Sequence, residues 1–216
     1  YTQNNRQAHA WEIDNILNSA REKGIFLKYT ILQHPELSSE NDDFWPENPY
    51  LEVLQEDATP IDFMNNNVTI TSFQNKLRYL IARWGYSTNI AWWELLTEID
   101  KIYNFEGHEV EVKTWFDIMA EKIKTFAYSA HMISGSYSKT FNNDDNDRIN
   151  NWIWRGDNCD FINIHNYSYN KKQNFDRFND VDKIQNTYDL DNKPILFGEM
   201  GTTSQPPVDS ATDLQF

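Results

Sequence analysis

Two glutamates in this chain stand where a parallel α/β fold would hold an active site. Glu199 follows the largely apolar segment KPILF and lies between two glycines. Glu98 closes the segment NIAWWELLTE, residues 89–98. A charge at the end of a buried segment is costly unless it is paired, hydrogen-bonded or used in chemistry. Two carboxyl groups that meet in one cleft can hydrolyse a glycosidic bond, one as a protonated acid and the other as an ionised nucleophile or base.

Alternating helical and extended patterns predict the elements that position these glutamates. Apolar residues at helical spacing predict helices over residues 11–23, 71–84, 112–127 and 176–190. Apolar, β-branched and aromatic runs predict strands over residues 25–32, 89–96, 131–137, 160–167 and 193–197. Strands that alternate with helices are typical of a parallel sheet, either open and doubly wound or closed into a (β/α)8 barrel. The sequence has no glycine-rich phosphate loop, which weakens the nucleotide-binding form of the open sheet.

Polar side chains gather at the carboxyl ends of the predicted strands, which is where (β/α)8 barrels hold their active sites. In chain order these residues are Gln33, His34, Thr97, Glu98, Ser134, Ser136, His165, Tyr167 and Glu199. Tyr167 can donate a hydrogen bond that keeps a carboxylate charged, and His165 can hold a sugar hydroxyl or tune the acid. His34 is a candidate for the wall of the cleft. Glu94 competes with Glu98, but its place in mid-strand predicts a structural pairing with a buried lysine or arginine.

Aromatic residues are abundant, with 8 Trp, 11 Tyr and 13 Phe. Aromatic rings suit the apolar faces of sugars. Trp45 and Trp93 are therefore candidates for substrate binding, and packing in the hydrophobic core is the competing interpretation for each.

Composition excludes several classes of function. The chain has 33 acidic and 19 basic residues and a formal charge of −14, which repels nucleic acid but does not repel a neutral or cationic substrate. No segment approaches the ~20 apolar residues of a membrane span. The single cysteine, Cys159, rules out a multi-cysteine metal site, and the acidic segment 142–148 lacks the glycine and distal glutamate of a calcium loop. We expect no metal and no cofactor.

Three segments together resemble one clan of retaining glycoside hydrolases, which includes cellulases and β-mannanases. RYLIARWGYSTNIAWWELLTEID resembles the clan's fourth-strand region, where a motif like WELWNE ends in the acid/base glutamate. INIHNY resembles the sixth strand with its His-x-Tyr pair, and FGEMG is similar to the seventh-strand motif that carries the nucleophile. The resemblance implies Glu98 as the general acid/base, Glu199 as the nucleophile, and His165 and Tyr167 as supports of the site.

The sequence departs from the clan in two ways. Thr97 stands where the clan usually has an asparagine whose amide contacts the sugar 2-hydroxyl, so part of the transition-state hydrogen bonding is expected to be weaker. The chain also matches only about strands three to seven, whereas a barrel needs eight. We therefore expect residues 1–216 to form a partial TIM-barrel catalytic domain, completed by the rest of the same polypeptide.

The sequence thus predicts a glycoside hydrolase that cleaves a β-linked oligo- or polysaccharide by double displacement. An extracellular or periplasmic location is expected, because polymeric glycans lie outside cells. The alternatives are a catalytically impaired carbohydrate-binding protein on a hydrolase-like barrel, and an α/β enzyme of unrelated chemistry. The last would be favoured if Glu98 and Glu199 lay far apart.

Overall fold

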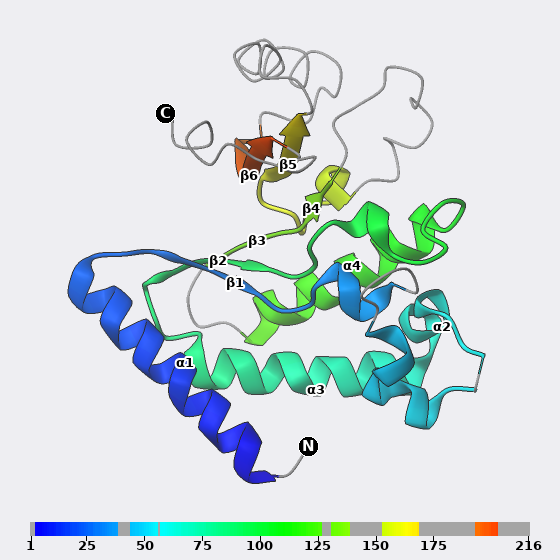
Figure 1. The fold of residues 1–216 in the computed structure, drawn as a ribbon, viewed down its shortest axis with the longest axis horizontal. Helices are drawn as coiled ribbons and strands as arrows, with labels where there is room; N and C mark the ends of the chain where they lie inside the picture. The colour runs from blue at the N-terminus through cyan, green and yellow to red at the C-terminus, as the bar shows by residue number, and fades with distance from the viewer. Residues whose placement is uncertain are drawn as a thin grey trace.

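The computed structural model describes residues 3–38, 44–55, 57–126, 131–138, 153–168 and 193–202. Its helices are α1 (Gln3–Lys23), α2 (Pro60–Asn65), α3 (Asn67–Trp84) and α4 (Glu109–Phe126), with short 3-10 helices η1 (His34–Leu37), η2 (Trp45–Glu47), η3 (Pro49–Val53), η4 (Ile99–Lys101) and η5 (Ile153–Arg155). Its strands are β1 (Leu27–Thr30), β2 (Ile90–Glu94), β3 (Met132–Ser134), β4 (Ser136–Tyr137), β5 (Ile162–Ser168) and β6 (Ile195–Thr202). Helices α1, α3 and α4 lie on one side of the β1–β2–β3 sheet (Figure 1).

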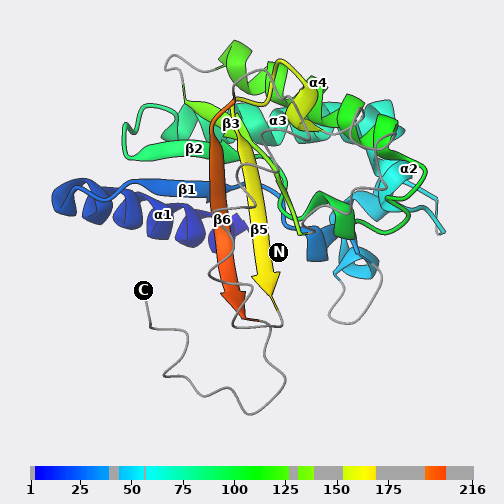
Figure 2. The same cartoon turned by 90° about the horizontal axis from the view of Figure 1, so that it is seen from above.

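The strands are all parallel and lie in chain order. β1 pairs with β2 and β2 with β3, while β4 pairs with β5 and β5 with β6. Figure 2 shows β5 and β6 side by side, running across the direction of β1 and β2. The predictions of an α/β class and of a parallel sheet are therefore confirmed.

Three of the four predicted helices are confirmed, as α1, α3 and α4. α3 begins four residues before the predicted start because the Asn66 side chain accepts hydrogen bonds from the backbone amides of Val68 and Thr69. α1 also begins earlier than predicted, at Gln3. The predicted helix over residues 176–190 lies outside the described residues. Within the described part of the chain, no helix combines the length and the apolar character that crossing a membrane requires.

Gly135 divides the third predicted strand into β3 and β4. Pairing with the segment after β2 continues on both sides of it, since Leu95 N donates to Ser134 O (2.9 Å) and Ser136 N donates to Leu96 O (3.1 Å). A glycine at such a point allows a strand to bend while another backbone approaches closely. Gly135 thus lies at the bend where the chain passes from β3 in the first sheet to β4 in the second.

Replacing Gly135 with alanine should lower the free energy of unfolding by about 1–3 kcal/mol, the usual effect of overpacking a core. The added Cβ would lie 2.7 Å from Ile153 Cδ1 and 2.9 Å from Leu96 O. Urea denaturation of the variant checks this. The exposed substitution Ser19→Ala in α1 is the control and should change stability by less than about 0.5 kcal/mol. Equal midpoints for both variants would contradict the assigned steric conflict.

Candidate active site

Glu98 lies between β2 and η4 in a left-handed backbone conformation, with φ 44° and ψ 55°. This region costs a residue with a side chain about 1–2 kcal/mol, so the surrounding structure must hold it there. The Glu98 amide donates to the hydroxyl of Ser136, at 3.0 Å, and the side chain of Ser136 is fully buried. The loop after β2 is thereby fixed to β4, which sets the direction of the Glu98 carboxylate.

Three basic side chains surround the Glu98 carboxylate. His165 Nδ1 lies 3.0 Å from Oε1, and His34 Nδ1 lies 3.3 Å from Oε2. Lys101 Nζ forms an ion pair with the same Oε2. Only 7% of the Glu98 side chain is exposed, whereas the Lys101 side chain is 48% exposed. A nearly buried carboxylate is thus paired with a cation that reaches it from the solvent side.

These contacts determine the protonation state of Glu98. Burial opposes its charge and alone would raise the carboxyl pKa, but hydrogen bonds from His165 and Lys101 and the charge of Lys101 outweigh burial and lower the pKa to about 2. Burial lowers the pKa of the nearby His34, against the opposing influence of Glu98. Glu98 is therefore ionised at neutral pH.

A register shift brings Glu199 into the same cluster. Ile164 pairs with Phe197, but the next residue, His165, pairs with Glu199, so Gly198 is the extra residue of a β-bulge. Paired residues of neighbouring parallel strands point to the same face, so the bulge places Glu199 on the face of His165. A Cβ at position 198 would lie 2.2 Å from Asn163 Oδ1, which explains the glycine before this glutamate.

The two glutamates meet around His165. His165 Nδ1 lies 3.4 Å from Glu199 Oε2, and this histidine side chain is 1% exposed. One carboxylate oxygen of Glu98, one of Glu199 and a ring nitrogen of His165 all lie within 4.8 Å of one another. The Glu199 side chain is 41% exposed and so faces solvent, while Glu98 lies deeper. The two carboxylates therefore lie close together but differ in exposure.

Glu94, the competing acid, is fully partnered. Its carboxylate pairs with Lys28 Nζ at 2.9 Å and accepts hydrogen bonds from Thr30 Oγ1 (2.8 Å) and Asn163 Nδ2 (2.7 Å). The residue is completely buried. The predicted structural pairing of Glu94 with a basic residue is confirmed.

The other predicted site residues have different placements. His34 contacts Glu98 directly, and Thr97 Oγ1 accepts from the His34 backbone amide at 3.4 Å, so both lie beside the cluster. Tyr167 is part of β5, but its side chain lies outside the described residues. Whether any of these residues binds substrate stays a prediction.

Trp45 and Trp93 require a correction, because both pack in the hydrophobic core. Trp45 is 6% exposed, and its Nε1 donates to Ala58 O at 2.9 Å. Trp93 has no exposed surface and packs against the ring of Tyr29 at a centroid distance of 5.0 Å. Neither ring is available to stack on a sugar in this structure. The competing interpretation of core packing holds for both.

Lys101 and Ser136 take part in the site although the sequence did not assign them a role. The spacing of Lys101 could have predicted its contact with Glu98, since an acid and a base three residues apart on a helical turn lie close together. The sequence identifies Ser136 only as a polar residue at a strand end. Its bond to the Glu98 amide depends on the left-handed loop, for which the sequence gives no signal.

The same cluster has the ligand types of a transition-metal site. Carboxylate oxygens and imidazole nitrogens bind such ions, and the three atoms from Glu98, His165 and Glu199 are close enough to share one. The ammonium of Lys101 already neutralises Glu98 and would compete with a metal ion for it. The expectation that the protein needs no metal stays a prediction.

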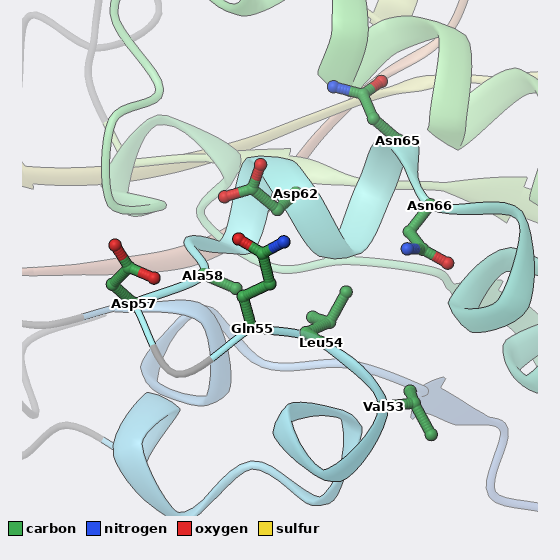
Figure 3. A pocket seen from close by; sticks show the side chains of 8 residues that line it. All are labelled: Val53, Leu54, Gln55, Asp57, Ala58, Asp62, Asn65 and Asn66. Carbon is green, nitrogen blue, oxygen red and sulfur yellow. The ribbon is translucent and has the colours of Figure 1, made fainter.

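A hollow of ≈ 650 Å³ adjoins the cluster. Its lining includes His34, Ser38, Asp100, Lys101, Tyr103 and Ser138. A second hollow of ≈ 700 Å³ lies between α2 and the segment after η3 (Figure 3), and its lining includes neither glutamate. Asp62 in that second hollow accepts from Thr59 Oγ1 and from the Thr59 amide, so it serves the start of α2. The lining of the first hollow also contains neither glutamate, but it includes His34 and Lys101, which both contact Glu98, so this hollow is the nearer of the two to the candidate site.

No protein-family model and no curated protein matches the chain. Two solved structures of the β-glucuronidase of Ruminococcus gnavus, both in complex with uronic isofagomine, are similar to it. One has 14% sequence identity and a TM-score of 0.53 over 91% of this chain and 30% of that chain. The other has 16% identity and a TM-score of 0.46 over 69% of this chain and 25% of that chain.

The chain therefore spans 30% or less of the length of these neighbours. At such low identity the likeness with a TM-score of 0.53 shows a shared fold and nothing of the reaction. The fold of the chain is therefore similar to that of part of this β-glucuronidase structure. The narrower resemblance to cellulases and β-mannanases stays a prediction from sequence motifs.

Proposed function

We propose that the chain is part of a (β/α)8-barrel glycoside hydrolase that cleaves a β-linked glycan with retention of configuration. Glu199 attacks the anomeric carbon while Glu98 protonates the departing oxygen. Glu98 then deprotonates the water that releases the sugar from Glu199. The remaining strands of the barrel would come from the rest of the polypeptide, and an extracellular or periplasmic location suits a polymeric substrate.

The proposal is carried by one observation, the approach of the Glu98 and Glu199 carboxylates to within 4.8 Å around His165. Retaining enzymes hold their two carboxyl groups about 5–5.5 Å apart, whereas inverting enzymes need about 6.5–9.5 Å to admit a water molecule. Glu94 does not compete for this role, since lysine, threonine and asparagine side chains occupy its carboxylate. The strand orders β1-β2-β3 and β4-β5-β6 support the barrel part of the proposal, because a (β/α)8 barrel has parallel strands in chain order.

One observation favours the second candidate, a carbohydrate-binding protein that has lost its hydrolytic activity. A general acid must carry a proton at the working pH, but Glu98 with a pKa of about 2 does not. Thr97 in place of asparagine removes a further contact to the sugar. Binding without turnover would result if the ion pair of Glu98 with Lys101 persisted after the glycan bound.

Product analysis tests the proposal. The complete protein is incubated with a panel of aryl β-glycosides that includes the glucoside, mannoside and glucuronide, and the anomer formed first is identified by proton NMR. The β anomer is expected. An α anomer formed first would show inversion and overturn the double-displacement mechanism. Binding of glycans without any hydrolysis would support the carbohydrate-binding alternative.

A further inference from the structure

Lys101 has the geometry of a removable counter-ion for Glu98. It belongs to η4, three residues after the glutamate, and its ammonium contacts Glu98 Oε2. About half of its side chain is exposed, and it lines the hollow of ≈ 650 Å³ beside the cluster. A molecule that entered this hollow would therefore meet the Lys101 side chain next to the oxygen that must deliver a proton.

The other groups that face Glu98 are less exposed than Lys101 or carry a negative charge. His165 from β5 is buried, His34 follows β1, and Glu199 from β6 adds a negative charge across His165. Asp100, the neighbour of Lys101, accepts from the Ser138 amide and hydroxyl, both at 2.7 Å, and so is directed away from the ammonium. Of the three basic side chains in contact with Glu98 in the described part of the chain, Lys101 is the most exposed, at 48%, against 27% for His34 and 1% for His165.

We propose that Lys101 is a positioning residue that holds Glu98 ionised in the free protein, and that the leaving-group part of a bound glycan displaces its ammonium from Glu98. This inference rests on the proposed function. Once the ammonium is displaced, Glu98 takes a proton from solvent and passes it to the departing oxygen as the glycosidic bond breaks. The electron pair of that bond leaves with the oxygen, and Glu199 supplies the pair for the new bond.

Two features support the displacement. A nearby cation favours the ionised form of a carboxyl by roughly 1–3 pKa units, and its removal reverses that effect. A half-exposed lysine reaches water by rotating its flexible stem, so leaving Glu98 does not strand its charge.

Kinetics of Lys101→Met in the complete protein test the proposal. The alkaline limb of kcat/KM reports the acid in the free enzyme, and that of kcat reports it in the complex. With the native lysine, we expect the kcat limb to lie at higher pH than the kcat/KM limb. In Lys101→Met the kcat/KM limb should rise by at least about one pH unit, while the kcat limb stays in place. Lys101→Arg retains a cation and should keep the native profile.

Lys113→Met is the control, because Lys113 also pairs with a carboxylate, Asp117, but within α4 and without contact to Glu98. It should leave both limbs unchanged. A kcat/KM limb that does not move in Lys101→Met, or that moves equally in Lys113→Met, overturns the inference.

Carbon-13 NMR of carboxyl-labelled glutamate separates this inference from the proposed hydrolysis. The Glu98 signal is assigned by its loss in Glu98→Gln and is then titrated in the native protein and in Lys101→Met. A higher Glu98 pKa in Lys101→Met supports the counter-ion role even if no glycoside is hydrolysed, in which case only the proposed function fails. An unchanged Glu98 pKa overturns the inference even in a protein that hydrolyses glycosides.

Discussion

Replacing Glu199 with glutamine should lower kcat/KM on an aryl β-glycoside by at least about 10⁴-fold, or about 5.5 kcal/mol in the barrier. An amide cannot form the glycosyl ester on which double displacement depends. Glutamine keeps the size of the side chain and an oxygen near His165 Nδ1, which lies 3.4 Å from the native carboxylate. The loss would therefore reflect missing chemistry and not a rearranged site. Steady-state kinetics of the complete protein provide the measurement.

Two comparisons make this result specific. Glu121→Gln changes an exposed glutamate of α4 in the same way and should retain full activity. In Glu199→Ala, added azide can take the place of the missing nucleophile and should restore turnover with an α-glycosyl azide as product. More than a tenth of the native activity in Glu199→Gln would show that this carboxylate is not the nucleophile.

Much of the fold follows from hydrophobic periodicity. The segments that contain Ile90 and Ile195 have continuous apolar runs, which are typical of strands in a parallel sheet covered by helices. Both segments are strands in the structure. The break at Gly135 and the bulge at Gly198 were not predicted. Both depend on a distant side chain that fills the space of a Cβ, Ile153 in one case and Asn163 in the other. Such tertiary contacts leave no periodic signal in the chain.

The sequence predicted only part of the candidate site, because some of its features also depend on tertiary contacts. The ends of parallel strands meet at one edge of a sheet, so the sequence could bring Glu98, His165 and Glu199 together. It could not separate exposed tryptophans from packed ones, and Trp93 lies in the core because its face of β2 meets α3 through Tyr29. The ionised state of Glu98 also depends on three-dimensional contacts that the motif does not encode.

Glu98→Gln should distinguish acid catalysis from simple positioning by its dependence on the leaving group. On a phenyl β-glycoside, whose oxygen needs a proton as it departs, kcat/KM should fall by about 10²–10⁴-fold. On a 2,4-dinitrophenyl glycoside, whose leaving group departs as a stable anion, the first step should change little. Release of the sugar from Glu199 should then become slow, because no base activates water, and a burst of phenolate should precede a low steady rate.

Azide provides the decisive comparison for Glu98→Gln. Because it needs no base, it should attack the sugar held on Glu199 and give a β-glycosyl azide, the opposite anomer to the product of Glu199→Ala. Equal losses on the two aryl glycosides would contradict proton transfer by Glu98 and leave it a positioning role. If the Glu199 and Glu98 variants give opposite azide anomers, the two side chains act on opposite faces of the sugar ring. Their approach around His165 allows this arrangement.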